Sequence, residues 1–156
     1  LGKSLPPSGK SKERDQIFKN IFVQNLWVTA AIFDLLRIYV LSIRWNLLRG
    51  NKVICDRYIW DTLIDFKIMF PDLDIDKWLI WKILVKISPV PYKQILLMIP
   101  LEVSIARCNQ KFDPFPDTPK IRKKRHTLYV LASNERKFIS IDADKKSAEV
   151  FEEIIK

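Results

Sequence analysis

Apolar residues recur at helical spacing along the first third of the chain. Over residues 15–49 they return every three or four positions, which predicts one long helix or two consecutive helices. Arg49 and Gly50 follow, and a basic last turn before a glycine is typical of a left-handed helix end. Residues 1–14, which combine Gly, Ser, Pro and Lys with few apolar side chains, are expected to form a linker or loop.

Three short segments predict strands, at residues 53–58, 94–99 and 137–142; the first two contain continuous apolar runs, and the first is expected to be buried. Runs without alternation are typical of parallel sheets, because both faces of such a sheet are covered. Helical patterns lie between and after the runs, at residues 59–69, 75–87, 102–109, 120–132 and 147–155. This order predicts an α/β fold with a parallel sheet flanked by helices over residues 15–156.

Asp56 and Arg57 come directly after the apolar positions of the first predicted strand. Ligands of open α/β sheets bind outside the carboxyl ends of the strands. A carboxylate suits a hard cation such as Mg²⁺, and a guanidinium can hold a phosphate through two parallel hydrogen bonds. The pair therefore predicts a site where a metal and an anionic substrate meet; the alternative is a salt bridge at the end of a strand.

The net charge indicates which kinds of partner the chain attracts, and the number of cysteines indicates its compartment. The 27 Lys and Arg exceed the 18 Asp and Glu, and the net charge of +9 attracts nucleotides, polynucleotides or acidic lipid without choosing among them. Two cysteines, one of them inside a predicted strand, favour a reducing, cytoplasmic setting without a disulfide framework or zinc cluster. Charged residues interrupt the apolar stretches 21–48 and 78–101, so no membrane span is expected.

Four fragments, taken together and in this order, resemble the carboxyl-terminal two-thirds of thymidylate kinase, a P-loop nucleoside monophosphate kinase. The resemblance spans about residues 30–156. The fragments are Leu48-Arg49-Gly50-Asn51-Lys52-Val53-Ile54-Cys55-Asp56-Arg57-Tyr58, Leu97-Met98-Ile99-Pro100-Leu101-Glu102-Val103 with Arg107, Tyr129-Val130-Leu131-Ala132, and Ile139-Ser140-Ile141-Asp142-Ala143.

The resemblance implies a set of site residues with ATP and Mg²⁺ as cofactors. Asp56 and Arg57 take catalytic roles, with Asp56 near the metal. The acceptor side is implied to use Arg57, Tyr58 and Arg37, and the nucleotide side Arg107, Lys111, Arg122 and Arg125. Residues 122–126 occupy the place of the mobile lid, although a solvated helix face would explain the same basic run. The lone His126 has no Cys or Asp partner at ligand spacing, so no metal or triad role is assigned to it.

Departures from the family pattern limit what can be carried over. The phosphate-binding loop and the first strand are expected to be lacking, because Ser4-Leu5-Pro6-Pro7-Ser8-Gly9-Lys10-Ser11 has no first glycine, contains two prolines and follows no apolar strand. Asp61 stands where the family usually has serine, and Ile64-Asp65-Phe66 replaces Ala-Tyr-Gln. Asp34-Leu35 replaces Asp-Arg, with Arg37 further on, so the acceptor need not be thymidylate.

The leading interpretation is a partial thymidylate kinase-like domain over residues 15–156, acting on a nucleotide and a phosphorylated small-molecule acceptor. Residues 1–156 alone are expected to show no transfer from ATP to thymidylate. One alternative is an inactive nucleotide- or nucleic-acid-binding module with the same fold, nucleic acid being the less favoured partner. Another is a structural or regulatory domain, suggested by its five tryptophans. The apolar helix fits either a homodimer contact or burial within the domain.

Overall fold

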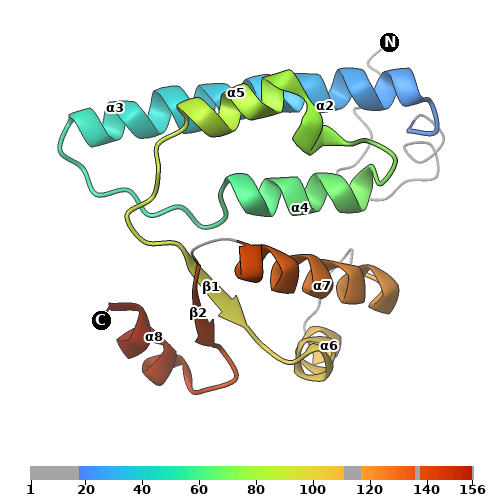
Figure 1. Cartoon of the computed structure of the whole chain (residues 1–156). Helices are drawn as coiled ribbons and strands as arrows, with labels where there is room; N and C mark the ends of the chain where they lie inside the picture. The colour runs from blue at the N-terminus through green and yellow to red at the C-terminus, as the bar shows by residue number, and fades with distance from the viewer. Residues whose placement is uncertain (1–17, 111–116, 136–137, 156) are drawn as a thin grey trace, which may run out of the picture. The chain divides into compact units, whose positions relative to one another are not determined.

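The computed structural model describes residues 18–110, 117–135 and 138–155 (Figure 1). The described residues form two compact units. Unit 1 takes the chain up to Asp56 together with Phe70–Pro89, and unit 2 takes Arg57–Met69 together with the chain from Val90 onward. The chain therefore passes from one unit to the other at three places, after Asp56, after Met69 and after Pro89.

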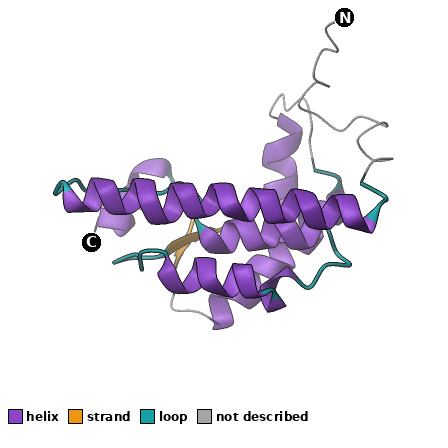
Figure 2. Ribbon diagram, turned by 90° about the horizontal axis from the view of Figure 1, so that it is seen from above, coloured by secondary structure: helices purple, strands orange, loops and turns teal. Residues whose placement is uncertain are grey.

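Unit 1 is built on a single long helix, as the spacing of its apolar residues predicted. It consists of α2 (Ile21–Leu35), a π-helical stretch η1 (Leu36–Ser42) and α3 (Ile43–Leu48), which follow one another without a break (Figure 2). Asn20 caps its start, because its side-chain oxygen accepts a hydrogen bond of 2.9 Å from the backbone N–H of Phe22.

The helix ends at the glycine that the sequence indicated. Gly50 has a φ of 78°, in the left-handed region, and its N–H donates to the carbonyl of Leu47 at 2.9 Å. The N–H of Asn51 donates to the carbonyl of Asn46 at 3.0 Å. These two bonds form a Schellman motif, in which the last carbonyls of the helix find donors beyond its end.

Apolar contacts hold unit 1 together. The short 3₁₀ turn η2 (Ile75–Lys77) leads into α5 (Leu79–Ile87), which packs against α2. The predicted helix 75–87 thus starts later than expected, because Trp78 is extended between the turn and α5. The fully buried side chains of this unit are Val28, Ile32, Ile75, Trp81 and Leu84. Phe18, Trp27 and Phe70 add an aromatic cluster with ring centroids 5.5–5.8 Å apart.

Much of the long helix remains exposed although it is apolar. Only Val28 and Ile32 are buried in α2, and none of the residues of η1 or α3 is. Large apolar side chains such as Phe22, Phe33, Leu41 and Leu48 are more than half exposed. By length and composition alone, Ile21–Leu48 could cross a membrane, a test that a core helix or a signal sequence also passes. The charged residues within it are therefore too few to exclude a span on this criterion.

Unit 2 contains the sheet. Strands β1 (Ile95–Met98) and β2 (Ile139–Asp142) pair in parallel, with Ile95 opposite Ile139 and Met98 opposite Asp142. Helices α6 (Leu101–Gln110) and α7 (Pro119–Glu135) connect them, α8 (Ser147–Ile155) follows β2, and α4 (Ile59–Met69) packs against α7 (Figure 1). Both strands lie within runs predicted to be strands, and their parallel pairing agrees with an α/β kinase-like fold.

The predicted buried strand at residues 53–58 is wrong for this structure. The segment has no strand conformation, and Ile54 is 96% exposed. Among the residues that the structure describes, the sheet has two strands, and neither pairs with this segment. A strand needs a neighbour for its backbone hydrogen bonds, so an apolar run without one stays an open segment in water.

Candidate functional site

Arg57 lies in a strained turn directly before α4. Its φ of 69° places a residue with a side chain in the left-handed region, which glycine normally occupies. The next N–H, that of Tyr58, donates to Oδ2 of Asp61 at 3.2 Å. Asp61 is the third residue of α4, and a carboxylate that reaches back to the N–H before the helix is one half of a capping box. Asp61 thus stabilises the turn that carries Arg57.

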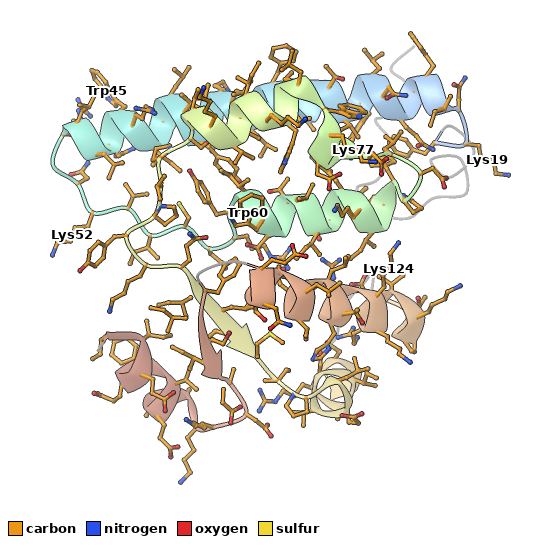
Figure 3. The ribbon with its side chains drawn as sticks, viewed as in Figure 1. Lys19, Trp45, Lys52, Trp60, Lys77 and Lys124 are labelled. Atoms are coloured by element: carbon orange, nitrogen blue, oxygen red, sulfur yellow. The ribbon has the colours of Figure 1, made fainter. Side chains whose placement is uncertain are left out.

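Two polar contacts join α4 to α7. The hydroxyl of Tyr129 donates to Oδ1 of Asp61 at 2.6 Å, and Nη1 of Arg125 donates to Oδ1 of Asp65. The partners are four residues apart on each helix and run in opposite directions, so the contacts lie one helical turn apart. Nζ of Lys124 adds a bond of 3.2 Å to the carbonyl of Lys67 (Figure 3). We call the pairs Asp61–Tyr129 and Asp65–Arg125 the α4–α7 ladder.

The pKa of Tyr129 and that of Arg125 are both raised within the ladder. Burial, and then the hydrogen bond to Asp61, raise the pKa of Tyr129 well above its usual range, because both favour the neutral phenol next to a carboxylate. Burial by itself would lower the pKa of Arg125, but its ion pairs with Asp65 and Asp117 outweigh this and raise it. Arg125 is therefore a permanent cation between two carboxylates.

Arg57 and Arg125, two of the arginines predicted to bind the acceptor or the nucleotide, have acidic partners. Nη1 of Arg57 lies 3.4 Å from Oδ2 of Asp65. Arg125 contacts Asp65 with Nη1, and its Nε lies 3.0 Å from Oδ2 of Asp117. Asp65 therefore contacts two guanidinium groups, one through each of its oxygens. The structure brings Arg57 and Arg125 to a common carboxylate, which the sequence did not predict.

Two of the other predicted nucleotide-binding residues, Arg107 and Arg122, lie elsewhere in unit 2. Arg107 of α6 donates to the carbonyl of Ala143 at 3.0 Å and to Oδ1 of Asp144 at 2.8 Å, so it holds the turn after β2. Arg122 of α7 contacts the thiol of Cys108. His126 lies with Nε2 3.2 Å from the carbonyl of Ile99, next to β1. Lys111 falls outside the described residues.

A family model with the description thymidylate kinase matches residues 14–154, nearly the whole chain. The chain belongs to the thymidylate kinase family. No curated protein and no solved structure matches it. Membership makes this a nucleotide kinase-like domain, and the resemblance inferred from the four sequence fragments is confirmed.

In the thymidylate kinase family to which the chain belongs, Asp56 is the residue predicted to act near the metal. Asp56 is exposed, and it is the last residue of unit 1 before the chain first passes into unit 2. In the described part of the chain, no three His, Cys, Asp or Glu side chains gather to hold a metal ion. One carboxylate still fits Mg²⁺, which typically keeps several waters and binds through one or two carboxylates plus substrate phosphates.

Arg37, predicted to bind the acceptor, lies on η1 in unit 1. Its Nε and Nη2 donate to Oδ1 of Asp34 at 3.0 and 2.9 Å, and both side chains are more than half exposed. Tyr58 is half-buried at the start of α4. A pocket of about 450 Å³ also lies in unit 1, but apolar and polar residues of the long helix line it, namely Val40, Leu41, Ser42, Arg44, Trp45 and Leu48. Asp56 is not among them.

Sequence reasoning missed the roles of Asp61, Asp65 and Tyr129. The two aspartates were visible only as departures from the thymidylate kinase pattern, and Tyr129 only as part of a resembling fragment. The spacing of four between Asp61 and Asp65 was the available signal, because it places both carboxylates on one side of a helix. The near-miss for a phosphate-binding loop, residues 4–11, lies outside the described residues.

Proposed function

We propose that this chain carries the acceptor, lid and closing elements of a nucleotide-dependent phosphotransferase domain, whose reaction moves a phosphoryl group from ATP to a nucleoside monophosphate or a related phosphorylated acceptor. The observation that carries the proposal is membership of the thymidylate kinase family across residues 14–154. The position of Arg57 supports it: an exposed guanidinium on a strained turn is suited to an incoming anion, and strained backbone is common at binding sites.

In this proposal, positioning and charge stabilisation supply the catalysis. Phosphoryl transfer needs little covalent chemistry from the protein, so aligned cations around the reacting phosphates are its main contribution. Arg57 holds the acceptor's phosphate, and Asp56 would hold Mg²⁺, which neutralises charge on the phosphates when bound. The resemblance to the family assigns Arg107 on α6 and Arg122 on α7 to the nucleotide. Arg125 acts less directly, because two carboxylates already contact its guanidinium.

The test is calorimetric titration of the full chain with thymidine monophosphate. Replacement of Arg57 by glutamine is expected to weaken binding by roughly tenfold or more, because a hydrogen bond to a charged group contributes about 1.5–3 kcal/mol. The matched control is Lys77→Gln, which removes an exposed cation of unit 1 that forms an ion pair with Asp74. Equal binding by the wild type and Arg57→Gln would contradict the proposed role.

A salt series distinguishes the nucleic-acid-binding alternative. Binding of a polynucleotide through many phosphates weakens steeply as salt is added, whereas a mononucleotide site responds weakly. We expect saturable binding of the mononucleotide with a shallow salt dependence. Binding of single-stranded DNA with a steep dependence, and none of the mononucleotide, would replace the kinase proposal by the binding module.

A further inference from the structure

The carboxylate of Asp65 occupies an unusual position between two arginines. It belongs to α4, while its partners come from the turn before that helix and from α7. Each of its oxygens contacts a different guanidinium group, which is an arrangement that phosphate oxygens also adopt with arginines.

The two contacts of Asp65 differ in strength. Arg125 is 24% exposed and bonds both Asp65 and Asp117. Arg57 is 63% exposed and contacts Asp65 only through one nitrogen at 3.4 Å, beyond the usual range of 2.7–3.2 Å for a good hydrogen bond. Exposed ion pairs of this kind contribute little to stability. Arg57 can therefore leave Asp65 at small cost, while Arg125 stays bound.

We propose that Asp65 is an internal counter-anion: it holds Arg57 while the acceptor is absent, and a phosphate group of the acceptor takes its place on that guanidinium. The proposal rests on the proposed function, since it takes Arg57 as the acceptor's phosphate ligand. Asp65 then lowers affinity for the acceptor in two ways. It competes for Arg57, and it leaves a negative charge beside the bound phosphate.

The ladder explains why this exchange need not disturb the fold. Arg125 remains paired with Asp65 and Asp117 after Arg57 moves, so α4 and α7 stay joined. Asp61 continues to hold the N–H of Tyr58, which keeps the turn of Arg57 in its left-handed conformation. Only the exposed side chain of Arg57 has to change partner.

The experiment uses inorganic pyrophosphate as a probe without a base, titrated into the full chain by calorimetry. Asp65→Asn, which removes the charge and keeps the shape, is expected to tighten binding by roughly fivefold or more. The matched control is Asp117→Asn, which takes the other carboxylate from Arg125 but does not contact Arg57, and it is expected to change binding less than about twofold. In the Arg57→Gln background, Asp65→Asn is expected to bring no gain.

Three results would overturn the proposal that Asp65 is a counter-anion of Arg57. These are weaker binding by Asp65→Asn, an equal gain in Asp117→Asn, or a gain that survives in the Arg57→Gln background. Should Asp65→Asn fail to fold, side-chain nitrogen NMR of the wild type decides instead. The guanidinium signals of Arg57 should shift on pyrophosphate addition while those of Arg125 stay, and a shift of both or of neither contradicts exchange at Arg57.

The outcome separates this inference from the proposed function. If pyrophosphate gives the expected pattern but neither thymidine monophosphate nor any other nucleoside monophosphate binds, the counter-anion holds for a phosphate ligand and the kinase proposal fails. If thymidine monophosphate depends on Arg57 and Asp65→Asn brings no gain with either ligand, the proposed function stands and the counter-anion is rejected.

Discussion

Each of the two units of this chain is held together internally by a different combination of contacts. Unit 1 packs a long apolar helix on α5 through fully buried side chains such as Ile32, Trp81 and Leu84. The ion pairs Asp34–Arg37 and Asp74–Lys77 of this unit lie on exposed surface. Unit 2 buries Ile59, Leu63, Ile64 and Phe66 of α4 and in addition joins α4 to α7 through the ladder, whose members are half-buried. Polar contacts in partial burial are directional, so unit 2 is the one suited to positioning a charged ligand.

The largest expected effect is the loss of a buried side chain in unit 1. Trp81 is 2% exposed, and its replacement by alanine should lower the free energy of unfolding by about 3–5 kcal/mol through lost burial and the cavity left behind. The measurement is the unfolding midpoint in urea. The matched control is Trp45→Ala on α3, where the side chain is 59% exposed and projects from the helix (Figure 3). A midpoint shift as large for Trp45 as for Trp81 would mean that the exposed face of the long helix is covered in solution.

A smaller effect is expected when the ladder loses its central cation. Arg125→Met keeps the length of the side chain but leaves Asp65 and Asp117 without their common partner. Both carboxylates are about a third exposed, so we expect a loss of about 1–3 kcal/mol, between the values for buried and surface ion pairs. The loss in the free energy of unfolding is measured by urea unfolding, with hydrogen exchange of the backbone amides of α4 and α7 as the probe of unit 2.

The control for Arg125 comes from unit 1. Lys77→Met removes an ion pair with Asp74 in which both side chains are at least 70% exposed, so no measurable change in the midpoint is expected. If the two methionine variants behave alike, the ladder is no more than a pair of surface contacts, and the distinction between the units is lost.

Local patterns in the sequence predicted much of the fold but not its connections. Helical periodicity placed α4 and α8 at their observed bounds, and apolar runs located β1 and β2. The same reasoning failed at residues 53–58, because hydrophobicity indicates which residues favour burial but not whether a neighbouring strand exists. For the site, residue type identified Arg57 as a cation suited to phosphate, and the resemblance to the thymidylate kinase family added Arg125. That both contact Asp65 could not be predicted, since Arg125 is 60 residues away from it in the sequence.

The smallest expected effect at neutral pH, and the one that most sharpens the comparison, concerns the ladder's phenol. Tyr129→Phe removes the donor to Asp61, so we expect a loss of about 1–2 kcal/mol in the free energy of unfolding at pH 7. Tyr92→Phe is the matched control in the same unit, because Tyr92 is 99% exposed, and it should leave the midpoint unchanged.

The pH dependence of the Tyr129 contribution has a definite sign. The folded state raises the pKa of Tyr129 above its ordinary value near 10, so as the pH rises past 10 the unfolded chain gives up this proton first. The unfolded state then binds fewer protons than the folded state, and stability falls with pH. The contribution of Tyr129 is therefore fully present below about pH 10 and is lost as the pH rises toward the folded-state pKa. Unfolding midpoints measured at intervals from pH 7 to about pH 11 should fall more steeply for the wild type than for Tyr129→Phe. Parallel curves would show that the phenol is not held by Asp61 in solution, and the ladder would then reduce to the ion pairs of Arg125.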